Sequence, residues 1–316
     1  MGPRHGLEPL VRILLWHVHG SWTDAFVRGA HDYLLPLVPG RGPDGRGRAD
    51  TYDWPAAARE VPWDRLRDER VDVVVCQRPH EPALAREWLG RDVPTVYVEH
   101  NTPAGDVPRT RHPLAGQDAV TLVHVTHFNE LYWDNGRAPT RVIEHGVPDP
   151  GPLYTGELPR AGVVVNEPVR RTRVAGTDLL PRFHERVPLD VFGMKVEGLP
   201  YGTYEDLPRH VMHAELARRR VYLHPYRWTS LGLALIEAMH LGMPIVALAA
   251  TEAIEAVPPE AGVLSTRVDV LADALHAFAR DPESAAQAGK AARAAALARY
   301  GLDRFLADWD RLLSEV

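Results

Sequence analysis

The sequence predicts an α/β fold with two domains, each built on a parallel β-sheet that is covered by helices on both faces. The chain has 316 residues, which is enough for two domains of ordinary size. In both halves, short runs of apolar residues alternate with helical segments, as expected for strands buried on both faces. A proline-rich segment at 148–152, Pro-Asp-Pro-Gly-Pro, separates the halves and marks the domain boundary.

The first half begins with an apolar strand, Arg12–Val18, which ends in the glycine turn His19-Gly20-Ser21. The later apolar runs are predicted strands, and the segments between them are predicted helices. Strands are expected at Tyr33–Val38, Val71–Cys76, Thr95–Glu99, Leu122–Thr126 and Arg141–Val147, and helices at Thr23–His31 and Ala83–Leu89.

The second half repeats this alternation, so both halves are predicted to be Rossmann-like. Strands are expected at Gly162–Val165, Leu189–Phe192, Val221–Pro225, Ile245–Ala250 and Gly262–Leu264, and helices at Gly176–His184, Leu207–Ala217, Leu231–Leu241, Asp269–Arg280 and Ala285–Tyr300. Leu302–Leu313 carries apolar residues at helical spacing and is expected to form a final amphipathic helix.

The composition argues against several classes of protein. A net charge of −6 gives no bulk attraction for nucleic acid. The single cysteine, Cys76, cannot form an internal disulfide, and no apolar stretch is long enough to span a membrane. We therefore expect a cytoplasmic protein. A peripheral contact with a membrane is compatible with this expectation.

Two segments match the residue pattern of a cofactor-binding or metal-binding motif but lack its structural context. Residues 40–45 match the glycine pattern of dinucleotide-binding loops, but prolines crowd the segment and no helix is predicted after it. Asp308-Trp309-Asp310 looks like a metal-binding acidic pair, yet it lies on the final amphipathic helix, where such acids are ordinary surface charge. We expect neither a metal site nor a bound cofactor.

The segment 229–241 is the most informative for function. The predicted helix Leu231–Leu241 is apolar on all sides except for Glu237, a buried acid that needs a partner. The preceding turn offers small and hydroxyl residues that leave helix N–H groups open to an anion. Ser230 and Glu237 lie roughly 10 Å apart along the axis. This spacing suits a diphosphate followed by a sugar diol, and a core salt bridge is the alternative for Glu237.

Thr229–Glu237 and the following Ala238–Ala247 resemble the E-x7-E motif of glycosyltransferase family 4, with Thr229 where that family has its first glutamate. Weaker similarities are found in Val142–Val147 and in Gly176–Leu180, where Ala175 replaces a family lysine. The resemblance covers the whole chain. It implies the GT-B fold, in which two Rossmann-like domains face each other across a cleft.

The resemblance also implies a division of labour and a reaction. Residues 1–150 would hold the acceptor, residues 151–300 would hold the nucleotide-sugar donor, and the terminal helix at 301–316 would pack back on the first domain. The reaction would be a retaining, metal-independent transfer from a UDP or GDP sugar to an acceptor hydroxyl. The acceptor would be a small molecule, a glycan or a lipid-linked molecule.

The expected site residues follow from the turns and from the resemblance. His100 matches the family's histidine near the donor sugar and is expected to be catalytic together with Glu237, whose carboxylate would accept hydrogen bonds from the ribose. Arginines after a strand would neutralise the diphosphate. The expected donor-binding residues are Gly20, Ser21, Arg170, Arg173, Ser230, Leu231, Gly232, Glu237 and Glu255, with Arg171 and His127 as lesser candidates.

Two alternative functions stay open at this point. A non-catalytic relative that binds nucleotide sugars is one, and Thr229 and Ala175 are the residues that favour it. A nucleotide-sugar epimerase of the same fold is the other, although no additional acid–base set is visible in the sequence.

Overall fold

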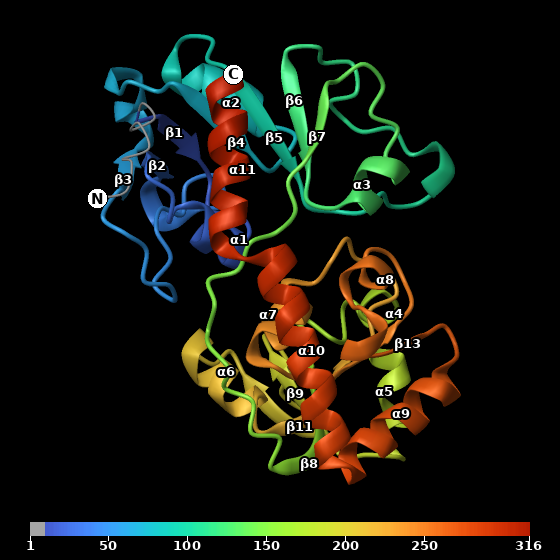
Figure 1. The fold of residues 1–316 in the computed structure, drawn as a ribbon. Helices are drawn as coiled ribbons and strands as arrows, with labels where there is room; N and C mark the ends of the chain where they lie inside the picture. Colours follow the sequence, from blue (N-terminus) through green and yellow to red (C-terminus); the bar gives the residue numbers. More distant parts are fainter. Residues whose placement is uncertain (1–9) are drawn as a thin grey trace, which may run out of the picture. The chain divides into compact units, whose positions relative to one another are not determined.

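The structure, a computed structural model, describes residues 10–316 and divides them into two compact units (Figure 1). Unit 1 contains the described residues up to Val125 together with Glu130–Ile143 and Phe305–Val316. Unit 2 contains Thr126–Asn129 and Glu144–Arg304. Each unit has one sheet whose neighbouring strands all run parallel, so the predicted α/β class with two parallel sheets is confirmed.

Unit 1 has a seven-stranded sheet in the order β3-β2-β1-β4-β5-β6-β7. Its strands are β1 (Arg12–Leu15), β2 (Asp32–Leu37), β3 (Ala58–Pro62), β4 (Val73–Cys76), β5 (Thr95–Glu99), β6 (Val120–His124) and β7 (Thr140–Val142). Its α-helices are α1 (Gly20–Phe26), α2 (Glu81–Leu89) and most of α11 (Leu302–Glu315), and α3 (His127–Tyr132) is divided between the units. Its 3-10 helices are η1 (Pro39–Arg41), η2 (Trp63–Asp68) and η3 (Val107–Arg109).

The final helix joins unit 1 through an aromatic contact. Trp309 is only 1% exposed, and its ring lies 5.8 Å from that of Trp22 and 4.9 Å from that of Phe26. Asp310 lies beside it on α11 and contacts His31, with 3.0 Å between Oδ1 and Nε2. The Asp308-Trp309-Asp310 sequence therefore lies on an amphipathic helix with its tryptophan in the core.

Unit 2 has a six-stranded sheet in the order β10-β9-β8-β11-β12-β13. Its strands are β8 (Leu158–Val164), β9 (Leu189–Gly193), β10 (Gly202–Glu205), β11 (Arg219–His224), β12 (Ile245–Leu248) and β13 (Gly262–Ser265). Its α-helices are α4 (Thr172–Ala175), α5 (Leu180–His184), α6 (Arg209–Leu216), α7 (Leu233–Leu241), α8 (Ala253–Ala256), α9 (Val268–Arg280) and α10 (Pro282–Tyr300), and its 3-10 helices are η4 (Thr177–Leu179) and η5 (Pro259–Ala261).

The apolar residues of unit 2 form two buried clusters. One contains residues of α6, α7 and α10, and the other contains residues of α5 and α9. Strand residues contribute alternately to the two clusters, as Tyr222 and Leu223 of β11 do. The sheet is therefore covered on both faces, which explains why its central strands are apolar throughout.

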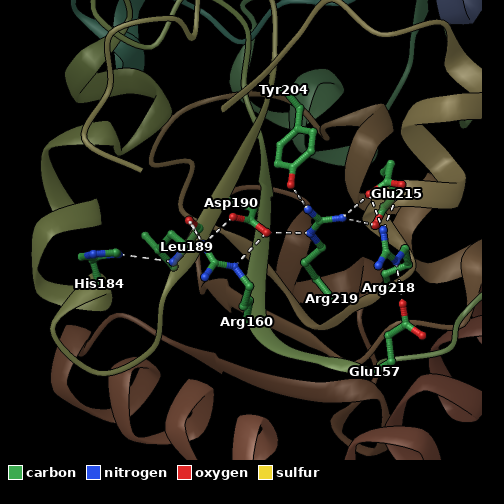
Figure 2. Close-up of polar contacts among 9 residues, drawn as sticks. All are labelled: Glu157, Arg160, His184, Leu189, Asp190, Tyr204, Glu215, Arg218 and Arg219. Atoms are coloured by element: carbon green, nitrogen blue, oxygen red, sulfur yellow. Dashed lines mark hydrogen bonds and ion pairs between the residues drawn. The ribbon is translucent and has the colours of Figure 1, made fainter. Parts of the chain in front are cut away.

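A buried ionic network holds together the amino-terminal ends of several strands in unit 2 (Figure 2). Asp190 of β9 accepts hydrogen bonds from Arg160 of β8 at 2.9 Å and from Arg219 of β11 at 2.7 Å. Arg219 is 1% exposed, and its guanidinium lies 4.6 Å from the ring centre of Tyr204 in β10. Burial alone would raise the pKa of Asp190, but the two arginines lower it.

The order of strands places one switch point in each sheet. The order in which successive strands are added across the sheet reverses between β1 and β4 in unit 1, and between β8 and β11 in unit 2. Ligands of open parallel sheets bind beyond the carboxyl ends of the strands at such points. The loops after β1, β8 and β11 are therefore the candidate segments for a ligand-binding site.

Several element boundaries differ from the sequence prediction. The first helix runs over Gly20–Phe26 instead of Thr23–His31, because it begins directly at the glycine turn. The helix predicted from Leu231 begins at Leu233, because Gly232 has extended backbone angles of φ −70° and ψ 121°. Strands β3 and β10 are absent from the prediction, since both are edge strands whose sequences mix polar with apolar residues.

In residues 10–316, none of the helices is long and apolar enough to cross a membrane.

Candidate functional site

The loop after β11 and the start of α7 form the first part of the candidate site in unit 2. Gly232 is the N-cap of α7, and no side chain caps the helix there. The first N–H groups of a helix have no acceptor within the helix and carry its positive dipole end. Ser230 and Leu231, which precede the cap, are 4% and 5% exposed. This turn therefore places the uncapped start of α7 after β11, and the donor-binding role expected of residues 230–232 stays a prediction.

His224 lies beneath this turn and is absent from the sequence prediction. A methyl group on Gly232 would lie 2.8 Å from the Cε1 atom of His224, so only glycine lets the turn approach the imidazole this closely. Burial lowers the pKa of His224 to about 3, which makes the ring neutral at physiological pH. Its Nδ1 atom is buried and has no hydrogen-bond partner among the described residues. The signal in the sequence was a histidine at the end of an apolar strand.

A cationic cluster lies beside this turn, on the loops after β8, β9 and β11. It consists of five cations, Arg170, Arg171, Arg173, Lys195 and Arg227, and two carboxylates, Glu167 and Asp178. The formal charges of these seven side chains sum to five minus two, or +3, and the carboxylate of Glu205, which accepts a hydrogen bond from the Lys195 N–H, adjoins them. Lys195 and Arg227 are absent from the sequence prediction, because strands far apart in the sequence bring them to the loop after β8.

Both carboxylates of the cluster are held by cations. Glu167 contacts Arg170 Nε at 2.8 Å and Lys195 Nζ at 2.7 Å, and these contacts lower its pKa to about 2. Asp178 accepts hydrogen bonds of 2.6 and 2.9 Å from Arg227. Arg173 lies 3.4 Å from Asp178 and is three-quarters exposed. The predicted Arg170 and Arg173 thus belong to one cluster, and Arg171 lies over the ring of Tyr226.

Glu237 lies further along α7 and faces α6. It is 5% exposed, and its two oxygens lie 3.2 Å from Arg209 Nη2 and 3.4 Å from His213 Nε2. Burial alone would raise the pKa of Glu237, but His213 and the charge of Arg209 outweigh burial and lower it. The carboxylate is therefore ionised, and the salt bridge named as the alternative from the sequence is present.

Glu255, the last predicted donor residue, is exposed at the end of α8. The neighbouring Glu252 is buried and uses both carboxylate oxygens. It accepts a 2.9 Å hydrogen bond from the Phe128 N–H and contacts Arg299 at 3.0 Å. Its own N–H lies 3.4 Å from the Ser230 carbonyl, so Glu252 connects the turn before α7 to the segment 126–129 that contains His127.

The remaining predicted residues lie in unit 1, after β1 and β5. The rings of His19 and His100 lie 4.0 Å apart, and Trp22 contacts His100 edge-on at 5.2 Å. Burial lowers the pKa of His19 to about 4. Ser21, in the first turn of α1, hydrogen-bonds the Tyr52 hydroxyl at 3.1 Å. Gly20 lies against the same tyrosine ring, where a methyl group would come within 2.9 Å.

The structure thus divides the predicted residues into two groups. Gly20, Ser21 and His100 gather in unit 1, together with His19. The cationic cluster and the turn 229–232 gather in unit 2, with Glu237 on the α6 side of the same helix. In residues 10–316, no group of three or more histidine, cysteine, aspartate or glutamate side chains is arranged to hold a metal ion.

One family model matches part of this chain. Residues 202–295 match the family model described as glycosyl transferases group 1, a segment that includes α6, the turn before α7 and Glu237. No curated protein matches the sequence.

Three solved structures illustrate the likeness of the whole fold. Sucrose-phosphate synthase of Thermosynechococcus elongatus has a TM-score of 0.72 at 14% identity, over 96% of this chain and 98% of that protein. HepE of Anabaena, in complex with UDP, has a TM-score of 0.71 at 16% identity, over 97% of this chain and 100% of that protein. A glycosyltransferase from Rickettsia africae has a TM-score of 0.69 at 12% identity, over 98% and 99% of the two chains.

Proposed function

We propose that this chain, which has the GT-B fold and matches the model of group 1 glycosyl transferases over residues 202–295, is a glycosyltransferase that uses a nucleotide-diphosphate sugar as donor. In this proposal the diphosphate binds at the carboxyl end of the unit 2 sheet. The observation that supports it most directly is the cationic cluster, whose net charge of +3 lies beside the amino terminus of the nine-residue helix α7.

The cluster supplies what a departing diphosphate needs. Arginine and lysine side chains form charge-assisted hydrogen bonds with phosphate oxygens, and helix N–H groups add to them. Arg170, Lys195 and Arg227 are now held by Glu167 and Asp178, which keeps them in place near the switch point. These side chains stabilise the charge of the leaving group, so we propose a transfer that needs no metal ion or further cofactor.

A uridine diphosphate is the first donor to test. HepE has been described in complex with UDP and with UDP-glucose, and its fold matches this chain over nearly its full length. A guanosine diphosphate donor is equally compatible with the cluster, which recognises the diphosphate and not the base. Glu237 would then accept hydrogen bonds from the ribose hydroxyls, which are the nearest diol to the diphosphate.

We propose a retaining transfer in which the acceptor attacks the face from which the diphosphate leaves. The bond between the sugar C1 and the phosphate oxygen breaks, a bond between C1 and the acceptor oxygen forms, and the acceptor proton moves to the departing phosphate oxygen. Positioning and charge stabilisation then supply the catalysis. His100 is the proposed unit 1 residue that hydrogen-bonds the sugar, and His19 is held against it.

The test is a transfer assay with UDP-sugars and GDP-sugars and a panel of small, glycan and lipid-linked acceptors. We expect nucleotide release that depends on an acceptor, persists in EDTA, and gives a product with the donor's anomeric configuration by NMR. Loss of activity in EDTA that added metal restores would contradict metal independence, and an inverted anomer would contradict retention.

One observation favours a non-catalytic sugar-nucleotide binder as a second candidate. Thr229 stands where the related motif has a glutamate, and Ala175 is fully buried where that family has a lysine. Lys195 and Arg227 compensate for the missing lysine charge in the cluster. Calorimetric binding of a donor without nucleotide release with any acceptor would favour this second candidate over transfer.

A further inference from the structure

Helix α6 presents two basic side chains to the one acid of α7. Arg209 and His213 are four positions apart in the sequence, so they lie on the same face of α6. Both approach Glu237, at 3.2 Å and 3.4 Å. Helix α6 belongs to the segment that matches the group 1 model, but neither residue is part of a motif in the sequence.

This arrangement is energetically demanding, because a carboxylate that is 5% exposed has lost nearly all of its water. Among residues 10–316, the other titratable groups that act on Glu237 are His240 on its own helix and Tyr222 in β11. Burial lowers the pKa of His240 and raises that of Tyr222, so both are neutral at physiological pH. The positive charge that balances Glu237 therefore comes from α6.

The pairing leaves hydrogen-bonding capacity unused. Oε1 of Glu237 is buried and accepts no hydrogen bond from the described part of the chain, since the 3.2 Å approach of Arg209 lacks hydrogen-bond alignment. An ionised carboxylate has about four lone-pair positions. Each of two neighbouring hydroxyl groups, as in a ribose ring, can donate one hydrogen bond to such a carboxylate.

We propose that Arg209 and His213 are positioning residues that orient Glu237 toward the ribose of the donor, and that they thereby set a preference for ribonucleotides over 2′-deoxyribonucleotides. This inference rests on the proposed function. In this proposal the salt bridge has two effects. Its contacts stabilise the buried carboxylate of Glu237, and they also fix the direction of the lone pairs that accept no hydrogen bond.

The experiment compares the affinities of UDP, 2′-deoxy-UDP, GDP and 2′-deoxy-GDP by calorimetry. We expect the wild-type protein to favour the ribose form about tenfold, the effect of one hydrogen bond to a charged group. Arg209→Met should weaken the ribonucleotide about tenfold and leave the deoxynucleotide nearly unchanged, which abolishes the preference. Arg209→Lys should retain most of it, and His213→Gln should reduce it in part.

Arg218→Met is the matched control, because Arg218 follows α6 closely but pairs with Glu157 and Glu215 instead of Glu237. It should keep the ribose preference. A purely structural role for Arg209 would lower the affinity of both sugar forms equally, and that result would overturn the inference.

The remaining outcomes separate the inference from the proposed function. Failure of the wild-type protein to bind any of the four nucleotides would contradict the proposed function itself. Binding without a ribose preference, or a preference that survives both Arg209→Met and His213→Gln, would overturn the inference alone. If Arg209→Met does not fold, as judged by circular dichroism, His213→Gln and Arg209→Lys decide.

Discussion

The two ends of the unit 2 sheet use the same chemical groups in opposite ways. At the amino-terminal end, Arg219 and Asp190 are almost completely buried and bind each other (Figure 2). At the carboxyl end, Arg170 and Arg173 are mostly exposed, and the cluster keeps a net charge of +3. The contrast predicts that burial and charge balance decide whether an arginine–carboxylate set supports the fold or can receive an anion.

The largest effect is expected at the buried end. Arg219→Met removes the more buried of the two arginines that compensate Asp190 and should lower the free energy of unfolding by about 3 kcal/mol, the lower end of the range for buried pairs that lose one partner. Urea denaturation measures the change, and hydrogen exchange of unit 2 peptides locates it. A loss below about 1 kcal/mol would show that the network is not a structural element.

The second effect depends on pH and concerns His224, which lies at the carboxyl end but is fully buried. Its pKa of about 3 in the folded state is below the ordinary value of 6.5, so below pH 6.5 the unfolded state binds more protons. The contribution of neutral His224 to the free energy of unfolding is fully present above pH 6.5. It should fall by about 2 kcal/mol between pH 6.5 and pH 5.

The check is the slope of the unfolding free energy against pH in the wild-type protein and in His224→Gln. The glutamine variant should have the shallower slope over this range, whatever its absolute stability. Equal slopes would mean that His224 is protonated in the folded protein. The histidines His19 and His240 also have lowered pKa values and are unchanged in both proteins.

The sequence predicted the central strands well because their signal is local. Val73–Cys76 and Ile245–Leu248 are buried at every position, and a run of apolar residues is sufficient to identify such a strand. β3 and β10 lie at sheet edges and carry polar residues such as Arg59 and Glu205, so their sequences resemble loops.

The sequence could group candidate site residues only where they are close along the chain. Ser230, Leu231 and Gly232 form one turn, and the arginines at 170 and 173 follow one strand. Lys195 contacts Glu167 across 28 residues, and Arg227 contacts Asp178 across 49, so only the folded sheet brings them together. Arg209 and His213 were missed for the same reason, since α6 reaches Glu237 through packing against α7.

A third effect sharpens the functional side of the comparison. Arg227→Ala removes a guanidinium from the cationic cluster and should weaken binding of UDP or GDP about tenfold or more, because hydrogen bonds to charged groups contribute about 1.5–3 kcal/mol. The free energy of unfolding should change by less than about 1 kcal/mol, the range of partly exposed pairs. Calorimetry and urea denaturation test both parts, and Arg267→Ala, which affects an exposed pair with Asp269, is the control.

The smallest effect is expected where arginine and carboxylate are both exposed and no site lies nearby. Arg186 and Asp273 form such a pair, with side chains 51% and 64% exposed. A double-mutant cycle with Arg186→Ala and Asp273→Asn should give a coupling energy below about 0.5 kcal/mol, and it should decrease further in high salt. A coupling as large as that of the buried network would mean that contact geometry matters more than burial, and the distinction between the two ends of the sheet would lose its physical basis.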